Sequence, residues 1–185
     1  STFVGWQAAT ANTTGSHNIA IGYTAYDAAD TENHNLAIGT DALGGSVAGG
    51  EFNVAIGNNA LDALTSSDGN VAIGYQAATD ITTGDNSVYV GYHAGYNATT
   101  ASTNIFVGYQ AAGLGVVTGG TNVGVGAQSL YDLTSGANNI AMGYRAGYNL
   151  TTAAGNTILG TQAVDTGILT GANNVVIGKL AGDNM

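Results

Sequence analysis

The 185-residue chain contains no cysteine and no proline, and its only cations are Arg145 and Lys179, against 12 acidic residues. Without cysteine the chain has no disulfide framework and no thiolate metal site. Its net charge of −10 argues against binding to nucleic acid or anionic lipid, because both need clustered Lys and Arg. Charged residues make up only 8% of the chain, yet no apolar run approaches the roughly 18 residues of a membrane-spanning helix. These absences argue against a disulfide-rich, a nucleic-acid-binding and a membrane-spanning protein, but they indicate no function.

Glycine, by contrast, is abundant, with 30 residues, and part of it recurs at a fixed spacing. Eleven glycines each close a short apolar triplet, and we call them the anchor glycines: Gly5, Gly22, Gly39, Gly57, Gly74, Gly91, Gly108, Gly126, Gly143, Gly160 and Gly178. Their spacings are 17, 17, 18, 17, 17, 17, 18, 17, 17 and 18 residues. A period this regular indicates a repeat architecture. We therefore predict one repeat domain that spans residues 1–185.

Two further positions of the repeat are nearly constant. Three residues after the anchor stands Ala in ten coils, which predicts a site where only a methyl group fits. Four residues before the anchor stands Ser1, Ser87 or, in nine coils, an asparagine: Asn18, Asn35, Asn53, Asn70, Asn104, Asn122, Asn139, Asn156 and Asn174. Stacked asparagines hydrogen-bond to one another and to turn backbone. We expect this asparagine ladder to be structural rather than a set of metal or sugar ligands.

The repeat predicts an all-β fold. The triplet before each anchor is short, β-branched and apolar, as in a strand. A second, weaker strand is expected half a period later, at Ile81–Gly84, Leu133–Gly136, Leu150–Thr152 and Leu169–Gly171. The prediction is a parallel β-solenoid, a flattened β-roll with two short strands in each 17–18-residue coil and about eleven coils. No helix is expected, because no 3.6-residue period is sustained.

Within each triplet, the outer two residues, such as Val71 and Ile73, share one face, which we predict to be the interior. The middle residue points the other way, yet it too is mostly apolar. A continuous exposed apolar stripe marks an interface, so we predict lateral self-association, most simply of three chains around a common axis. The predicted inter-chain face consists of Ala20, Ala37, Ala55, Ala72, Tyr89, Phe106, Ala141, Ile158 and Val176.

An aromatic residue often follows the anchor, and a long polar residue often comes next. Such a column could line a glycan-binding face, or its rings could stack in register and cover the edge of the roll. The residues concerned are Trp6, Tyr23, Tyr75, Tyr92, Tyr109 and Tyr144, with Gln76 and Gln110.

The motif Asn-x-Ala-Ile-Gly-x-x-Ala, as at Asn70–Ala77, resembles the head repeats of trimeric autotransporter adhesins. The longer unit from Asn139 to Thr152 is more similar to repeats of phage tail fibres and bacterial surface fibres. The resemblance implies a trimeric, left-handed β-roll outside the cell or on a virion, which binds a matrix, a cell surface or glycans. We expect the chain to be a segment of a longer fibre or a subunit that stacks end to end.

Catalytic patterns are missing. Cysteine is absent, no Gly-x-Ser-x-Gly sequence occurs, and His17, His34 and His93 lie in different coils. We expect no enzymatic activity, no cofactor and no metal, although His17 and His34 share a repeat position and could stack about 5 Å apart. Two alternative functions stay open: a glycan-binding fibre tip, and an ice-binding solenoid, which the pairs Thr82-Thr83, Thr99-Thr100 and Thr151-Thr152 suggest.

Overall fold

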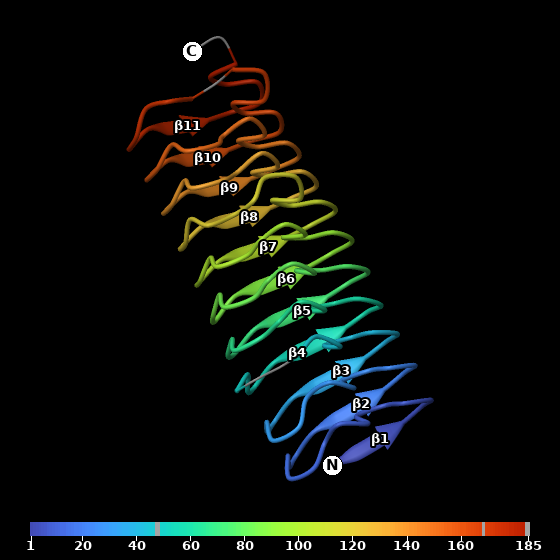
Figure 1. Ribbon diagram of the computed structural model, residues 1–185. Coiled ribbons are helices and arrows are strands. Elements are labelled where there is room, and N and C mark those ends of the chain that lie inside the picture. The colour runs from blue at the N-terminus through green and yellow to red at the C-terminus, as the bar shows by residue number, and fades with distance from the viewer. Residues whose placement is uncertain (47–48, 168, 184–185) are drawn as a thin grey trace.

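The chain forms one rod of stacked coils, with its termini at opposite ends (Figure 1). A computed structural model describes residues 1–46, 49–167 and 169–183. The strands in this described part are β1 (Thr2–Val4), β2 (Ile19–Ile21), β3 (Leu36–Ile38), β4 (Val54–Ile56), β5 (Val71–Ile73), β6 (Val88–Val90), β7 (Ile105–Val107), β8 (Val123–Val125), β9 (Ile140–Met142), β10 (Thr157–Leu159) and β11 (Val175–Ile177). They form a single parallel sheet in chain order. The predicted all-β parallel solenoid is confirmed, and the described residues contain no helix.

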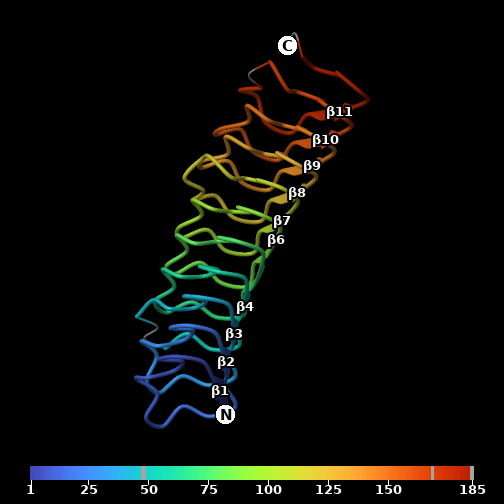
Figure 2. The same cartoon turned by 90° about the vertical axis from the view of Figure 1, so that its right-hand side faces the viewer.

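The coils stack one above another along the rod (Figure 2). Equivalent residues of successive coils pair in register, so the strand hydrogen bonds run along the rod. Between β5 and β6, for example, Ala72 pairs with Tyr89. The register also holds across the 18-residue coils, where Ala37 pairs with Ala55 and Phe106 with Gly124. The extra residue of those coils is therefore accommodated in the turns and not in the sheet.

The prediction of a second strand in each coil is wrong. At Ile81–Gly84 the segments do stack, but a single carbonyl, that of Thr99, accepts from both Thr82 N at 2.9 Å and Thr83 N at 3.5 Å. A parallel ladder needs evenly spaced bonds from alternating residues. Side-chain burial does not follow a strand's period of two either, because Ile81 is buried while Thr83, two residues later, is exposed. This wall is a stack of turns that faces one sheet.

The two faces of the sheet are the reverse of the prediction. The middle residue of each triplet points into the roll, and the outer two point away from it, so Ala72 is fully buried while Ile73 is exposed. The nine residues predicted as an inter-chain face are buried within the single chain: Ala20, Ala37, Ala55, Ala72, Tyr89, Phe106, Ala141, Ile158 and Val176. They form the core, together with the column of alanines that follows the anchors, of which Ala77 and Ala94 are fully buried.

In several coils a small residue accompanies a large one across this narrow core. The middle residue and the residue six positions later form such pairs, as in the fully buried Ala20 with Tyr26 and Ala37 with Leu43. In two coils both residues are small, Ala72 with Ala78 and Ala141 with Gly147, and Leu130 and Ile158 of the adjacent coils lie beside Gly147. Where the middle residue is the large Tyr89, the later position is Gly95, and a Cβ there would collide with the Tyr89 ring. Interiors pack at nearly constant density, and the middle position accordingly varies from Gly124 to Tyr89 with the size of its neighbours.

The anchor glycines form the corner after each strand. Their φ angles lie between +127° and +145°, a region that L side chains rarely adopt. They also approach the next coil closely, since a Cβ on Gly143 would lie 2.6 Å from the carbonyl oxygen of Gly160. At the interior anchor positions the φ angle and the close approach of the next coil therefore both favour glycine.

Replacement of an interior anchor glycine should therefore destabilise the rod more than replacement of the last one. Gly178 has the same kind of φ, but a Cβ there would meet only Ala181 Cβ at 3.8 Å. We expect Gly178→Ala to cost about 1–3 kcal/mol from backbone strain alone. Gly143→Ala should cost clearly more, because it adds the collision with Gly160. Equal losses in urea unfolding would show that the close approach contributes nothing.

Candidate interaction surface

The outer face of the sheet is a continuous apolar surface. Two columns form it, contributed by the first and third residues of every strand, and we call it the aliphatic face. Of its 22 positions, 20 are aliphatic or Met and two are Thr: Thr2, Val4, Ile19, Ile21, Leu36, Ile38, Val54, Ile56, Val71, Ile73, Val88, Val90, Ile105, Val107, Val123, Val125, Ile140, Met142, Thr157, Leu159, Val175 and Ile177. No charged residue interrupts it.

Every residue of the aliphatic face is partly or largely exposed in the single chain. Neighbours above and below cover the flanks of each side chain, yet Ile73 retains 38% and Met142 44% of its surface. A solvated strand face normally carries polar residues. The sequence signal for this face was the nearly constant aliphatic character of the outer residues, whereas the middle residues vary widely in size.

The aromatic column follows the corner glycines and is exposed. Trp6, Tyr23, Tyr75, Tyr92, Tyr109 and Tyr144 keep between 43% and 71% of their surface. In three successive coils the rings stack, with centroids 5.4 Å apart from Tyr75 to Tyr92 and again from Tyr92 to Tyr109. Polar neighbours bond along the same direction: Gln76 Oε1 lies 2.8 Å from His93 Nε2, and Gln128 donates to Gln110 Oε1 at 3.3 Å.

This stacking decides what the aromatic column can present to a ligand. The ring planes differ by only 16° and 12°, so each tyrosine face is turned toward the next tyrosine. The ring of His93 stacks on Tyr92 as well, with centroids 3.9 Å apart. A sugar that binds by stacking needs an open ring face, whereas Tyr92 presents its edge and its hydroxyl group. For Tyr75, Tyr92 and Tyr109 the geometry therefore favours the interpretation that the rings cover the edge of the roll.

The asparagine ladder is continuous and is buried from Asn18 to Asn156. The Oδ1 of each of these buried asparagines accepts a hydrogen bond from the backbone N–H of the equivalent residue one coil later, for instance from Asn139 N to Asn122 Oδ1 at 3.0 Å. Their Nδ2 groups bond backbone carbonyls, many of them across the coil, as from Asn70 to Gly84 O at 2.9 Å. Ser87 serves in the ladder through its hydroxyl, which accepts from Asn104 N at 3.0 Å. These amides satisfy buried backbone groups, as the structural interpretation of the ladder predicted.

Substitutions at Asn70 should separate the role of its Oδ1, which accepts from the next coil, from the role of its Nδ2, which donates to backbone carbonyls. Asn70→Ala leaves the buried Ser87 N–H without its side-chain acceptor, and an unsatisfied buried group costs about 1–3 kcal/mol, whereas the Gly84 carbonyl keeps its hydrogen bond from the Ser67 hydroxyl. Asn70→Ser should cost less, because a serine hydroxyl can still accept from the next coil, as that of Ser87 does. Urea unfolding of the two variants checks the order. An Asn70→Ala variant as stable as the parent would contradict the structural role.

His17 and His34 stack as expected, with centroids 4.7 Å apart, and Phe52 continues the stack at 5.0 Å from His34. The two imidazole planes differ by 11°. Because nitrogen lone pairs lie in the ring planes, those of two parallel rings do not converge on one ion. Within the described residues no group of three or more His, Asp or Glu side chains is arranged to hold a metal ion.

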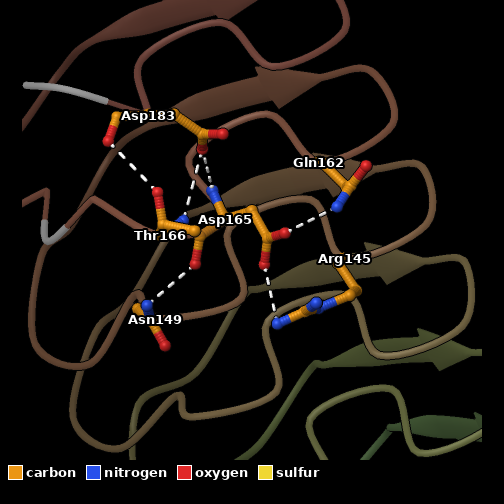
Figure 3. Close-up of polar contacts among 6 residues, drawn as sticks. All are labelled: Arg145, Asn149, Gln162, Asp165, Thr166 and Asp183. Carbon is orange, nitrogen blue, oxygen red and sulfur yellow. Dashed lines mark hydrogen bonds and ion pairs between the residues drawn. The ribbon is translucent and has the colours of Figure 1, made fainter.

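A polar cluster near the C-terminal end of the rod joins three successive coils (Figure 3). Asp165, whose side chain is almost fully buried, pairs with Arg145 at 3.0 Å and accepts from Gln162 Nε2 at 2.9 Å. The Arg145 guanidinium also lies 4.0 Å from the Tyr148 ring centroid. Asp183 caps the cluster, because its Oδ1 accepts from Asp165 N at 2.7 Å. One of the chain's two cations is thus engaged in holding coils together.

Acidic side chains gather on the N-terminal half of the rod. Burial raises the pKa of Asp62, a bond from Asn59 Nδ2 at 3.3 Å opposes the rise, and the nearby Asp41, Asp27 and Asp80 add to it. Burial likewise raises the pKa of Asp80. In such groups the charged form is less favourable in the folded than in the unfolded chain.

Neutralising Asp62 should therefore stabilise the fold at neutral pH. Since the folded pKa is raised, the folded chain is relatively favoured below the ordinary aspartate pKa of about 3.9 and loses that advantage as the pH rises through the folded value. We expect Asp62→Asn to raise the thermal midpoint at pH 7 and to have little effect near pH 3. A destabilised variant at pH 7 would contradict this.

Glu32 provides a matched control, because its pKa is shifted in the opposite direction to that of Asp62. Burial alone would raise its pKa, but donation from the backbone N–H groups of Gly49, Thr31 and Asp30 outweighs burial and lowers it. Its charged form therefore stabilises the fold, and that stability is lost as the pH falls through the folded pKa. Glu32→Gln should lower the thermal midpoint at pH 7 and lose its effect in acid.

No protein-family model, curated protein sequence or solved structure matches this chain significantly. Among the residues that the structure describes, no helix is long and apolar enough to cross a membrane.

Proposed function

We propose that the chain is a structural or adhesive segment of an extracellular fibre and that copies of it associate side by side through the aliphatic face. The proposal rests chiefly on one observation: the outer columns of the sheet are apolar and accessible along the whole described rod. Contiguous exposed apolar surface beyond a few hundred Å² marks an interaction site in soluble proteins.

The dimensions of the aliphatic face fit an interface between chains. Eleven strands about 4.8 Å apart and about 10 Å long give a face on the order of 500 Å². That area approaches the roughly 800 Å² that each partner contributes to a stable complex. Residues that border the face would supply the remainder.

The repeat of the face favours a second copy of the chain as the occupant. Side chains such as Ile56, Ile73 and Val90 follow one another at the fixed spacing of paired strands. A partner can fill the gaps between them along the whole rod only if it has the same spacing, and a second copy has it by construction. The face also carries no charge that would require a complementary charge on a partner.

The resemblance to adhesin heads and tail fibres supports the remaining parts of the proposal: three chains around a common axis, a left-handed roll, and a place on a cell surface or virion. In a three-fold assembly the aliphatic faces would lie toward the axis. The corners with the aromatic column and the turns around Thr83 would lie outside, where they could contact a surface or matrix.

A charge placed on the aliphatic face should disperse the assembly. Ile73 is exposed in the single chain, so Ile73→Lys should fold normally but place several like charges together at the interface. We expect the parent protein to sediment as an oligomer and the variant to shift toward the monomer at the same micromolar concentration. The matched control is Thr83→Lys, an exposed position in the turn wall, which should leave the sedimentation unchanged.

The outcome that contradicts the proposal is a parent protein that is monomeric at micromolar concentration. A dispersed Thr83→Lys variant together with an assembled Ile73→Lys variant would locate the contact on the turn wall instead. Electron micrographs of the parent should show straight rods rather than globular particles.

A further inference from the structure

The stacked tyrosines have a second chemical property besides covering the edge of the roll. Tyr75, Tyr92 and Tyr109 occupy three successive coils and keep 46%, 43% and 52% of their surface exposed. Adjacent centroids lie 5.4 Å apart in both pairs, and the rings are within 16° of parallel. Three phenols are thus held next to one another in the open. We call them the tyrosine ladder.

Adjacent exposed phenols are the substrate of oxidative coupling. A one-electron oxidant removes one electron and the hydroxyl proton from each of two tyrosines, which leaves two phenoxyl radicals with spin at the ortho carbons. These carbons form a C–C bond, and the ring protons return to the oxygens. With a haem peroxidase the balance is two tyrosines and one hydrogen peroxide to one dityrosine and two water molecules.

From this geometry we propose that the tyrosine ladder is an oxidative cross-linking site at which Tyr92 couples with Tyr75 or Tyr109 to join neighbouring coils covalently. Holding two reacting groups side by side replaces a slow bimolecular encounter with a local one. The exposed hydroxyl-bearing edges give the oxidant access, and the small displacement needed lies within the freedom of exposed side chains.

The composition of the chain offers few other side chains for a covalent cross-link. There is no cysteine for a disulfide and only Lys179 for amine chemistry. Tyrosine, with ten residues, is the one cross-linkable side chain in quantity. Without such a bond, only non-covalent ladders hold the stacked coils together. A covalent bond between coils would therefore oppose their separation.

Five of the seven other tyrosines provide internal controls. Tyr26 and Tyr89 are fully buried, so an oxidant reaches neither. Tyr144 is exposed, but its equivalents in the neighbouring coils are Ala127 and Thr161. Tyr131 and Tyr148 do stack, at 4.8 Å, but both are less exposed than the tyrosine ladder and Arg145 covers the Tyr148 ring.

The experiment treats the whole chain with horseradish peroxidase and limiting hydrogen peroxide, then measures dityrosine fluorescence and peptide masses. Cleavage before aspartate separates Tyr75, in fragment 68–79, from Tyr92 and Tyr109, in fragment 85–131. A Tyr75–Tyr92 bond therefore joins these fragments with the loss of two hydrogens. A Tyr92–Tyr109 bond gives the same loss within fragment 85–131, where tandem mass spectrometry distinguishes it from bonds that involve Tyr96 or Tyr131. Trypsin cuts after Arg145 and separates Tyr131 from Tyr148, so coupling of that pair joins the two tryptic fragments.

Two variants complete the test. Tyr92→Phe leaves Tyr75 and Tyr109 two coils apart, beyond coupling distance, while the ring stack persists. We expect it to lower the dityrosine yield roughly tenfold. Tyr144→Phe should leave the yield unchanged, and circular dichroism should show both variants folded like the parent. The proposal is overturned if folded Tyr92→Phe keeps the parent's yield, or if the coupled peptides are mainly Tyr131–Tyr148 or inter-chain products.

Discussion

Parallel pairing of equivalent residues is the constraint on which the whole structure depends. Each strand bonds the same residues of the next coil, such as Ala72 with Tyr89, so the spacing between coils is fixed by the backbone. Every side chain then has its equivalent directly above and below it. A residue type that stacks well on itself is favoured at each position, while one that repels itself accumulates its penalty along the rod. The scarcity of charge in the chain is consistent with this.

The regular stacking of the coils also provides hydrogen-bond partners for the buried polar groups. In the asparagine ladder one amide bonds both the next coil and the opposite wall, as Asn70 does through Ser87 N and Gly84 O. The anchor glycines allow the corner that follows each strand, at a φ and a closeness of approach that a side chain would not tolerate. Strand, corner and ladder therefore hold one another in register, although each strand has only three residues.

The same stacking arranges equivalent residues in columns on the surface of the rod. The aliphatic face and the tyrosine ladder arise because one favourable residue is repeated, and both extend over several coils. A globular protein would scatter such residues singly. Here a modest preference at one position becomes a continuous strip, and continuous strips support the proposals of association between chains and of cross-linking within a chain.

The period, the parallel solenoid and the stacked asparagines follow from the sequence alone, because a conserved spacing of Asn, apolar triplet and glycine has few other physical explanations. Alternation in a strand also shows that Ala72 points opposite to Val71 and Ile73, but it does not show which side is inside. The tertiary structure decided that question. The interior is narrow and holds residues of very different size, in several coils a small one with a large one, such as Ala37 with Leu43 and Tyr89 with Gly95, while the two aliphatic columns lie outside. Likewise, only the coordinates distinguish a second strand from stacked turns at Thr82, since one carbonyl serving two amides leaves no trace in the sequence pattern.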